Sequence, residues 1–238
     1  MRTTTILGFP ILALVLHGCG PATLDIIPDD GTLRGWHVSS RTSHGTGGRW
    51  VARDGVILGT QDRPGNGGLL ITDAQYGDFE IRLDMKNDYG PDSGLFLRCT
   101  EDGRAYQAMI DYHPDGNLMG IYGEGIGNFV ARNFDTLGSP GEIKIRDYPK
   151  FPCPFSPEEW KSRIWRADDW NELRARIVGN PPVIHTWING VKVMEFTDDR
   201  KRLPDRGGIG LQLHGKEDSS GRFVRYRNIR LSVLEERP

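Results

Sequence analysis

The sequence predicts an all-β fold, namely a two-sheet antiparallel β-sandwich formed by one domain over residues 30–238. Apolar residues recur with a period of two from about residue 30 onward, and 31 glycines and 15 prolines provide many turns. Short strands that each have one apolar face become stable when two sheets stack these faces against each other. Aliphatic and aromatic residues make up 37% of the chain, which is sufficient for such a core.

Individual strands and turns can be assigned along the chain. Residues 79–86, FEIRLDMK, alternate strictly between apolar and charged side chains, as a half-exposed antiparallel strand does. Asp54-Gly55 and Asn189-Gly190 are dipeptides that favour type I′ turns, and each separates two short apolar runs. The PDGN motif at residues 114–117 predicts a further turn between two strands.

One segment interrupts this rhythm. Residues 125–168 contain few alternating runs, and four prolines between positions 149 and 157 exclude a central strand there. The run SPEEWKSRIW predicts a short helix with Ser156 as its N-cap, Pro157 at its first position and Glu158 and Glu159 in its first turn. We therefore interpret residues 125–168 as a loop and short-helix insertion at one end of the sandwich.

The first 18 residues are expected to be a signal peptide. Arg2 precedes the apolar run ILGFPILALVL, which is too short for a stable membrane anchor. The run ends in LHGC, which resembles a bacterial lipoprotein box, in which Cys19 becomes the lipid-modified first residue; an ordinary cleaved signal is the alternative. Both interpretations predict export to the periplasm or cell envelope. Residues 19–29 would then be a linker, and the lipid anchor of the lipoprotein form is the only membrane contact expected.

Charge and motif content exclude several function classes. The formal net charge is −2 and no stripe of clustered Lys and Arg is visible along the sequence, so nucleic acid is not an expected partner. The sequence contains no H-E-x-x-H metal motif, no G-x-S-x-G serine motif and no phosphate loop. Cys99 and Cys153 could form a disulfide in an exported chain, or Cys99 could simply pack inward as a thiol.

Alternation also indicates which polar side chains point away from the core. The outward residues of three predicted strands are Phe96, Arg98, Gln107, Met109, Asp111, Gln212 and His214. Amide groups both donate and accept hydrogen bonds, and aromatic rings cover the apolar face of a sugar, so this set suits carbohydrate. An ordinary solvated face is the alternative, because a register shift of one residue would reverse every side chain.

Six segments, taken in order, carry a resemblance to a known family. They are GGLLITDAQYGDFEIRLDMK, DSGLFLR, AYQAMID, DDWNELRARIVGNPPVIHTWINGVKVMEF, GGIGLQLHG and VRYRNIRL. Over about residues 30–236 the chain resembles the 3-keto-disaccharide hydrolase domain family. The resemblance implies a jelly roll of the concanavalin A-like lectin/glucanase superfamily, in an exported lipoprotein form. It also implies a carbohydrate substrate, a glycoside with a ketone at carbon 3 of its ring.

The implied substrate suggests roles for the outward residues. A ketone at carbon 3 acidifies the proton on carbon 2, so a base can form an enolate, the glycosidic oxygen can leave carbon 1, and water can add to the double bond. His214 is the first candidate for base or acid, since the ordinary pKa of histidine is about 6.5. Arg98 could stabilise the enolate, and Asp111 or Glu124 could be the second proton-transfer group. The candidates for binding the sugar are Gln107, Gln212, Phe96 and Tyr122.

Cofactor and class remain partly open at this point. No cofactor is required by the sequence, although a divalent cation could replace Arg98 at the enolate. A non-catalytic carbohydrate-binding module on a lipid anchor would use the same face without an acid–base pair. A glucanase of this fold would need paired carboxylates such as E-x-D-x-x-E, which the sequence lacks. We therefore rank a hydrolase or lyase of 3-keto-glycosides first.

Overall fold

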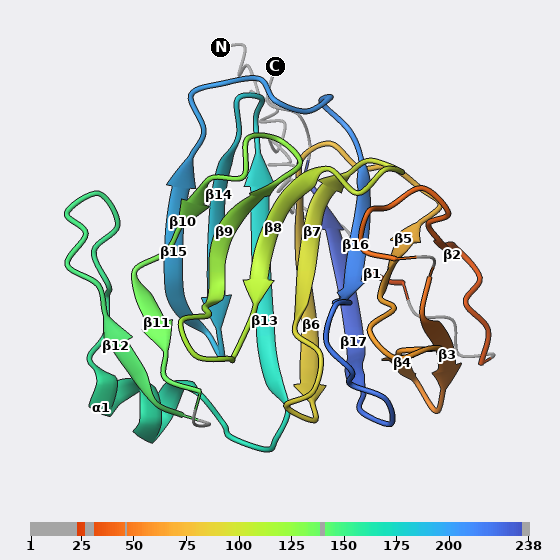
Figure 1. Ribbon diagram of the computed structural model, residues 1–238. Coiled ribbons are helices and arrows are strands. Elements are labelled where there is room, and N and C mark those ends of the chain that lie inside the picture. Colours follow the sequence, from red (N-terminus) through yellow and green to blue (C-terminus); the bar gives the residue numbers. More distant parts are fainter. Residues whose placement is uncertain (1–22, 27–30, 46, 139–140, 235–238) are drawn as a thin grey trace, which may run out of the picture.

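The computed structural model describes residues 23–26, 31–45, 47–138 and 141–234. In this part of the chain two large antiparallel sheets stack face to face, which confirms the predicted β-sandwich (Figure 1). The predicted signal peptide and Cys19 lie outside the described residues. Among the residues that are described, no helix has the length and apolar character needed to cross a membrane.

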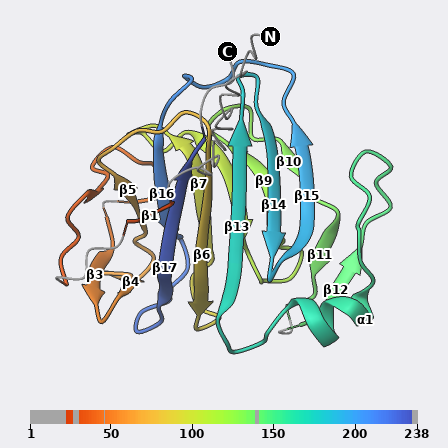
Figure 2. The same cartoon turned by 180° about the vertical axis from the view of Figure 1, so that it is seen from behind.

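The first sheet, sheet A, has eight strands. It faces the viewer in Figure 2, which shows the molecule from behind. Its order is β15 (Val191–Thr197), β14 (Val183–Ile188), β13 (Asn171–Val178), β6 (Phe79–Asn87), β17 (Val224–Val233), β4 (Val56–Thr60) and β3 (Arg49–Arg53), and β1 (Thr23–Asp25) pairs with β17. Both predicted type I′ turns are confirmed. Asp54 and Gly55 between β3 and β4, and Asn189 and Gly190 between β14 and β15, all have positive φ, as this turn requires.

The second sheet, sheet B, has seven strands. Its order is β10 (Val130–Ala131), β9 (Leu118–Glu124), β8 (Ala105–Ile110), β7 (Ser93–Cys99), β16 (Gly208–Leu213), β5 (Gly68–Thr72) and β2 (Trp36–Val38). The alternating apolar residues of both sheets meet in one core, where Leu95 on β7 and Leu211 on β16 join Phe79 and Leu83 on β6. Each such side chain stabilises the fold by about 1.5–3 kcal/mol through burial.

Residues 125–168 contain short strands as well as the predicted helix. The predicted helix start is confirmed at α1 (Pro157–Glu159), where Ser156 and Glu159 form a reciprocal capping box, and one π-helical turn, η1 (Trp160–Ile164), follows. The segment also contains three short strands, namely β10, β11 (Phe134–Thr136) and β12 (Ile143–Ile145). Strands of two or three residues are too short to show a period of two, so alternation could not predict them.

Strand β7 departs from regular alternation at Arg98. Arg98 has a φ of 51°, and the pairing of β7 with β16 shifts register between Gly208 and Gly210. Beyond this bulge Cys99, which was expected to point inward, packs instead with Phe96 and Leu69 in a small apolar cluster on the outer side of sheet B. Cys99 and Cys153 are both free thiols, so they do not form a disulfide.

Candidate functional site

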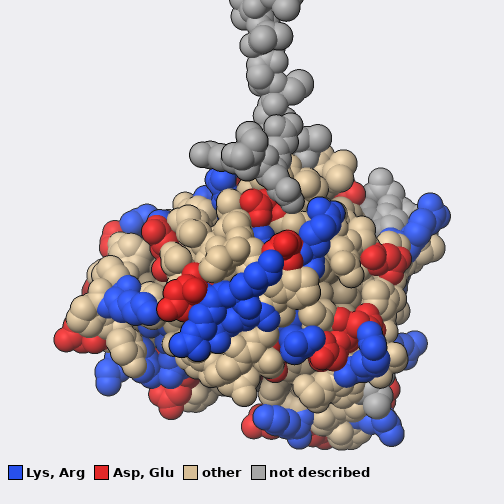
Figure 3. Space-filling view, turned by 90° about the horizontal axis from the view of Figure 1, so that it is seen from above, with Lys and Arg blue, Asp and Glu red and all other residues tan. Residues whose placement is uncertain are grey.

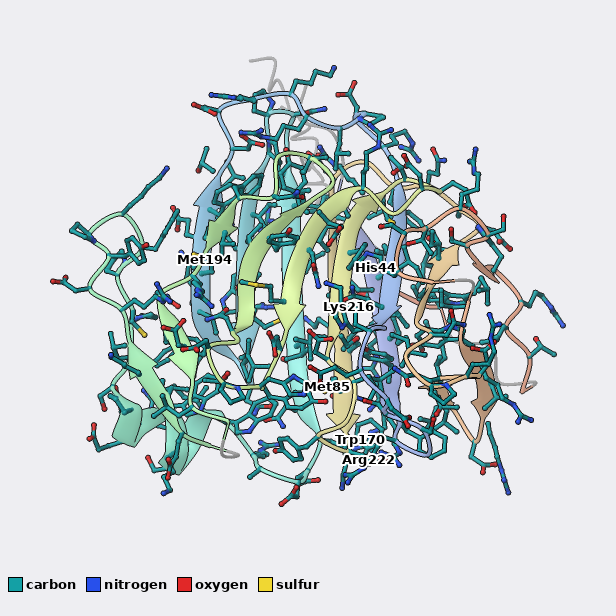
Figure 4. The ribbon with its side chains drawn as sticks, in the orientation of Figure 1. His44, Met85, Trp170, Met194, Lys216 and Arg222 are labelled. Carbon is teal, nitrogen blue, oxygen red and sulfur yellow. The ribbon has the colours of Figure 1, made fainter. Side chains whose placement is uncertain are left out.

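A polar pocket of about 340 Å³ lies on the outer face of sheet B. Its lining residues are Ser43, His44, Asp92, Gln107, Met109, Asp111, Tyr122, Glu124, Gln212, His214 and Lys216. A second hollow of about 520 Å³ shares Asp92, Asp111, His214 and Lys216 with the first, so the two form one depression. In Figure 4, His44 and Lys216 are labelled beside β7 and β16 of sheet B.

The structure brings six of the eight predicted catalytic and sugar-binding residues into this pocket. They are Gln107, Asp111, Tyr122, Glu124, Gln212 and His214. Alternation predicted the orientation of those on β8 and β16 correctly, and Gln107 lies directly opposite Tyr122 of β9. A glycine on β7 makes room for them, because a Cβ atom at Gly94 would lie 2.2 Å from Gln107 Nε2.

The expected outward orientation of Arg98 is wrong. The bulge in β7 buries its side chain, which is 1% exposed. Its guanidinium donates hydrogen bonds to the carbonyl oxygens of Gly77 and Gly179 and to Asp78 Oδ1, at 3.1, 2.8 and 2.8 Å. All of these partners are internal to the protein, so Arg98 stabilises the fold and does not line the pocket.

Phe96 points to the outer side of sheet B, as predicted, but it is fully buried. His44 covers it in a T-shaped contact, with 5.6 Å between the ring centroids. Phe96 therefore supports His44 from below and does not line the pocket.

A chain of carboxamides orients His44. Gln107 Nε2 donates to Gln212 Oε1 at 2.9 Å, which directs Gln212 Nε2 toward His44 Nδ1 at 3.0 Å. This arrangement assigns the proton of the neutral ring to Nε2, which lies 3.8 Å from Glu124 Oε1 and has no hydrogen-bond partner among the described residues. Burial, together with the nearby charges of His214 and Lys216, lowers the pKa of His44 to about 4. His44 is therefore neutral at pH 7.

Beside this chain, His214 and Asp92 form an acid–base pair. His214 Nδ1 lies 3.0 Å from Asp92 Oδ1, although this contact lacks the geometry of a regular hydrogen bond. Burial and the charge of Asp111 raise the pKa of Asp92 to about 7, while burial and the charge of Lys216 lower the pKa of His214. Both shifts favour the neutral forms, so the two groups are suited to exchanging a proton near neutral pH.

Asp111 connects this pair to a group of residues that could bind a metal ion. Asp111 Oδ1 accepts a hydrogen bond from the His113 backbone at 3.0 Å and lies 3.1 Å from His113 Nδ1, which raises the pKa of His113. Asp92, Asp111 and His113 each offer one ligand atom, and these three atoms lie within 4.8 Å of one another. Two carboxylates and an imidazole are a suitable donor set for a divalent cation such as Mn²⁺ or Zn²⁺.

Four functional candidates were missed by the sequence reasoning, namely His44, Asp92, His113 and Lys216. His44 and Asp92 come from loops before β3 and β7, and no local pattern links them to β16. Lys216 could have been predicted, because it follows Gln212 and His214 at the same interval of two residues. Its ammonium group provides the positive charge in the pocket that Arg98 was expected to supply.

Comparisons with known proteins were made on the sequence and on the fold. The family model of the 3-keto-alpha-glucoside-1,2-lyase-like domain matches residues 25–232. A 3-keto-disaccharide hydrolase from Bacteroides thetaiotaomicron is 24% identical over 245 residues, which cover 87% of this chain and 77% of that protein.

Two solved structures have the same fold. One, from Parabacteroides distasonis and provisionally described as a glycosyl hydrolase, has a TM-score of 0.51 and 22% identity, with 85% of this chain and 95% of that chain covered. The other, a β-glucanase from Bacillus licheniformis, has a TM-score of 0.56 and 12% identity, with 92% of this chain and 100% of that chain covered. At these identities both similarities concern the fold alone.

Proposed function

The chain belongs to the family of 3-keto-alpha-glucoside-1,2-lyase-like domains, and from this premise we propose that it cleaves 3-keto-glycosides by acid–base elimination and hydration. The observation that carries this proposal is the convergence of two acid–base pairs, His214–Asp92 and His44–Glu124, with Lys216 in one pocket. The relative from Bacteroides thetaiotaomicron, a 3-keto-disaccharide hydrolase, supports the substrate class.

The pocket residues can perform the elimination. His214, backed by Asp92, removes the proton from carbon 2, and the electron pair moves toward the carbon 3 oxygen to form the enolate. Lys216 stabilises the developing negative charge on that oxygen. The enolate then collapses to restore the ketone and form a double bond between carbons 1 and 2, and the bond from carbon 1 to the glycosidic oxygen breaks. Glu124, whose pKa burial raises, donates a proton to that oxygen as it leaves. Asp111 is the alternative donor at this step.

Hydration completes the hydrolysis. Glu124, now a carboxylate, takes a proton from water as the water oxygen bonds to carbon 1, and His214 returns a proton to carbon 2. Gln107, Gln212 and Tyr122 provide hydrogen-bonding groups for the sugar hydroxyls. A divalent cation held by Asp92, Asp111 and His113 would take over the stabilisation of the enolate from Lys216.

The test is incubation of the purified protein with a 3-keto-glucoside and with the unoxidised parent glucoside. The proposal predicts release of sugar from the oxidised substrate alone. Parallel assays with a chelator, and with Mn²⁺ or Zn²⁺ added back, separate the Lys216 route from the metal route. If neither glucoside is cleaved although the 3-keto-glucoside binds, the pocket belongs to a carbohydrate-binding module instead.

We also propose that the protein is exported and anchored by a lipid on Cys19, as the LHGC motif indicates. In a bacterial host, the expected result is fractionation of the protein with membranes and its release by the substitution Cys19→Ser. Equal fractionation of both proteins would contradict lipid attachment at this residue.

A further inference from the structure

The outer face of sheet A has an unbalanced charge. Strands β13, β6 and β17 are neighbours in the centre of this sheet (Figure 2). Their outward positions hold seven cations and three carboxylates, namely Arg82, Lys86, Arg174, Arg176, Arg225, Arg227, Arg230, Glu80, Asp84 and Glu172. The whole chain has a net charge of −2, so positive charge is concentrated on this face. At the end of the molecule seen in Figure 3, by contrast, blue and red side chains are interspersed.

The strand register aligns three of these cations in a row. Arg82 on β6 lies directly opposite Arg230 of β17 on one side and opposite Arg174 of β13 on the other. The row continues across β14 and β15, where Trp187 lies opposite Arg174 and Lys192 lies opposite Trp187. Like charges placed directly opposite each other destabilise a sheet. Folding alone therefore does not favour this row.

The carboxylates of this face neutralise the row only in part. Arg82 Nε donates to Glu80 Oε1 at 3.1 Å, and the same oxygen lies 3.9 Å from Arg174 Nη1. Arg174 stacks over Trp187, with its guanidinium carbon 3.7 Å from the ring centroid, and its Nε has no hydrogen-bond partner among the described residues. That Nε is buried, so the row offers an external anion its net positive charge. With Lys192 the row holds four cations, and three carboxylates pair with them, namely Asp25, Glu80 and Glu195.

Apolar side chains extend the same face toward its edge. Val51 of β3 is 42% exposed, and it lies opposite Leu58 of β4, which in turn lies opposite Arg225 of β17. Trp187 at the other end of the row is half-buried. Cations beside an aromatic ring and exposed aliphatic groups are typical of a surface that contacts the headgroup region of a bilayer.

The path of the chain brings this face close to the proposed lipid anchor. Thr23, in β1 of sheet A, follows Cys19 by four residues, and an extended chain spans at most about 3.6 Å per residue, or about 14 Å in total. Asp25 of β1 also pairs with Arg230 at the end of the row, at 3.3 Å. An anchored molecule would therefore hold sheet A within reach of the membrane surface.

We propose that the outer face of sheet A docks onto a bilayer rich in anionic phospholipids, with the arginine row against the phosphate groups. The pocket on sheet B then faces away from the membrane, toward dissolved substrate. This proposal draws on the proposed lipid anchor, concerns orientation and does not depend on the proposed reaction.

The test measures binding to vesicles with and without phosphatidylglycerol. Full-length protein carrying Cys19→Ser in every arm is sedimented with vesicles of pure phosphatidylcholine, or with 30% phosphatidylglycerol added. Each cation near an anionic leaflet strengthens binding about fivefold. The variant Arg82→Gln/Arg176→Gln/Arg230→Gln should therefore bind the anionic vesicles at least about tenfold more weakly than the parent. The matched control, Lys144→Gln/Lys161→Gln/Arg163→Gln, removes the same charge from exposed positions of the 125–168 segment and should bind like the parent.

Four results would overturn the proposal. The first is equal binding to both kinds of vesicle, and the second is equal loss of binding in the control variant. The third is binding of the parent to a uronate polysaccharide but not to the anionic vesicles, which would assign the face to an acidic glycan. The fourth is binding that does not weaken when NaCl is raised from 0.05 to 0.5 M. Circular dichroism of all variants verifies that each one is folded.

Discussion

At the scale of single residues, His214 carries most of the proposed chemistry. The substitution His214→Asn keeps a hydrogen-bonding side chain and removes the proton-transfer group, so kcat/KM for a 3-keto-glucoside should fall by about 10²–10⁴-fold. Substrate binding measured by calorimetry should change much less. His185→Asn is the control, because His185 lies on sheet A beside Glu195 and outside the pocket. Unchanged turnover by the His214 variant would remove this residue from the mechanism.

Asp92 provides a test based on stability and pH. The pKa of Asp92 is about 7 in the folded protein, against about 3.9 in an unfolded chain. Between these values the folded state holds a proton that the unfolded state has lost, so this group's contribution to stability falls as the pH rises. Asp92→Asn has no such proton. The stability of the variant relative to the parent should therefore increase from pH 4 to pH 7, by at most about 1.4 kcal/mol per pH unit.

Urea unfolding at several pH values measures this difference. The variant must be compared with the parent because His44 also titrates in this range. Its pKa of about 4 makes a contribution to stability that rises with pH, opposite in sign to that of Asp92. That contribution is present in both proteins and cancels when they are compared. A stability difference that does not change with pH would show that Asp92 is ionised throughout.

At the scale of single elements, the bulge in β7 determines what Arg98 does. Arg98→Leu leaves Asp78 without its guanidinium partner at a largely buried position, so the free energy of unfolding should fall by about 3–5 kcal/mol. Because Arg98 does not line the pocket, kcat/KM of the folded fraction should stay within about twofold of the parent value. Arg104→Leu is the control, since its half-exposed pair with Asp102 contributes at most about 1 kcal/mol. A large loss of kcat/KM in a stable Arg98 variant would show that Arg98 contributes to the reaction.

The same strand provides a test of the sugar-binding amides. Gly94→Ala places a methyl group 2.2 Å from the present position of Gln107 Nε2, so the carboxamide must move and its bond to Gln212 is lost. KM for the substrate should rise several-fold while the fold is kept. The double variant Gly94→Ala/Gln107→Ala removes the clash and serves as the control. If its KM equals that of Gln107→Ala alone, the effect of the glycine acts through Gln107; a further rise would indicate a wider disturbance of β7.

These elements also show how far sequence reasoning reached. Alternation oriented Gln107, Asp111, Gln212 and His214 correctly, because β8 and β16 are regular up to those positions and have one apolar side. It failed at Arg98, because a bulge adds a residue that a strict period of two cannot represent. It could not find His44, whose position depends on one hydrogen bond with Gln212 and on packing over Phe96. Such contacts between distant segments leave no local pattern.

At the scale of the whole molecule, the sandwich separates two surfaces of different chemistry. The order β9, β8, β7, β16 in sheet B joins strands that are far apart in the sequence, and this order assembles the pocket. The cations of β6, β13 and β17 lie on the opposite side of the molecule, with the apolar core between the two faces. Binding at one face therefore leaves the other face free.

This separation leads to a prediction that joins both proposals. Addition of vesicles containing 30% phosphatidylglycerol, enough to bind most of the protein, should leave kcat/KM for a small 3-keto-glycoside within about twofold of its value without lipid. The reason is that a pocket facing away from the bilayer stays open to the solvent. Vesicles of pure phosphatidylcholine are the control for adsorption of the substrate. Inhibition that increases with the bound fraction would instead place the opening of the pocket against the lipid, and the proposed orientation would then have to be reversed.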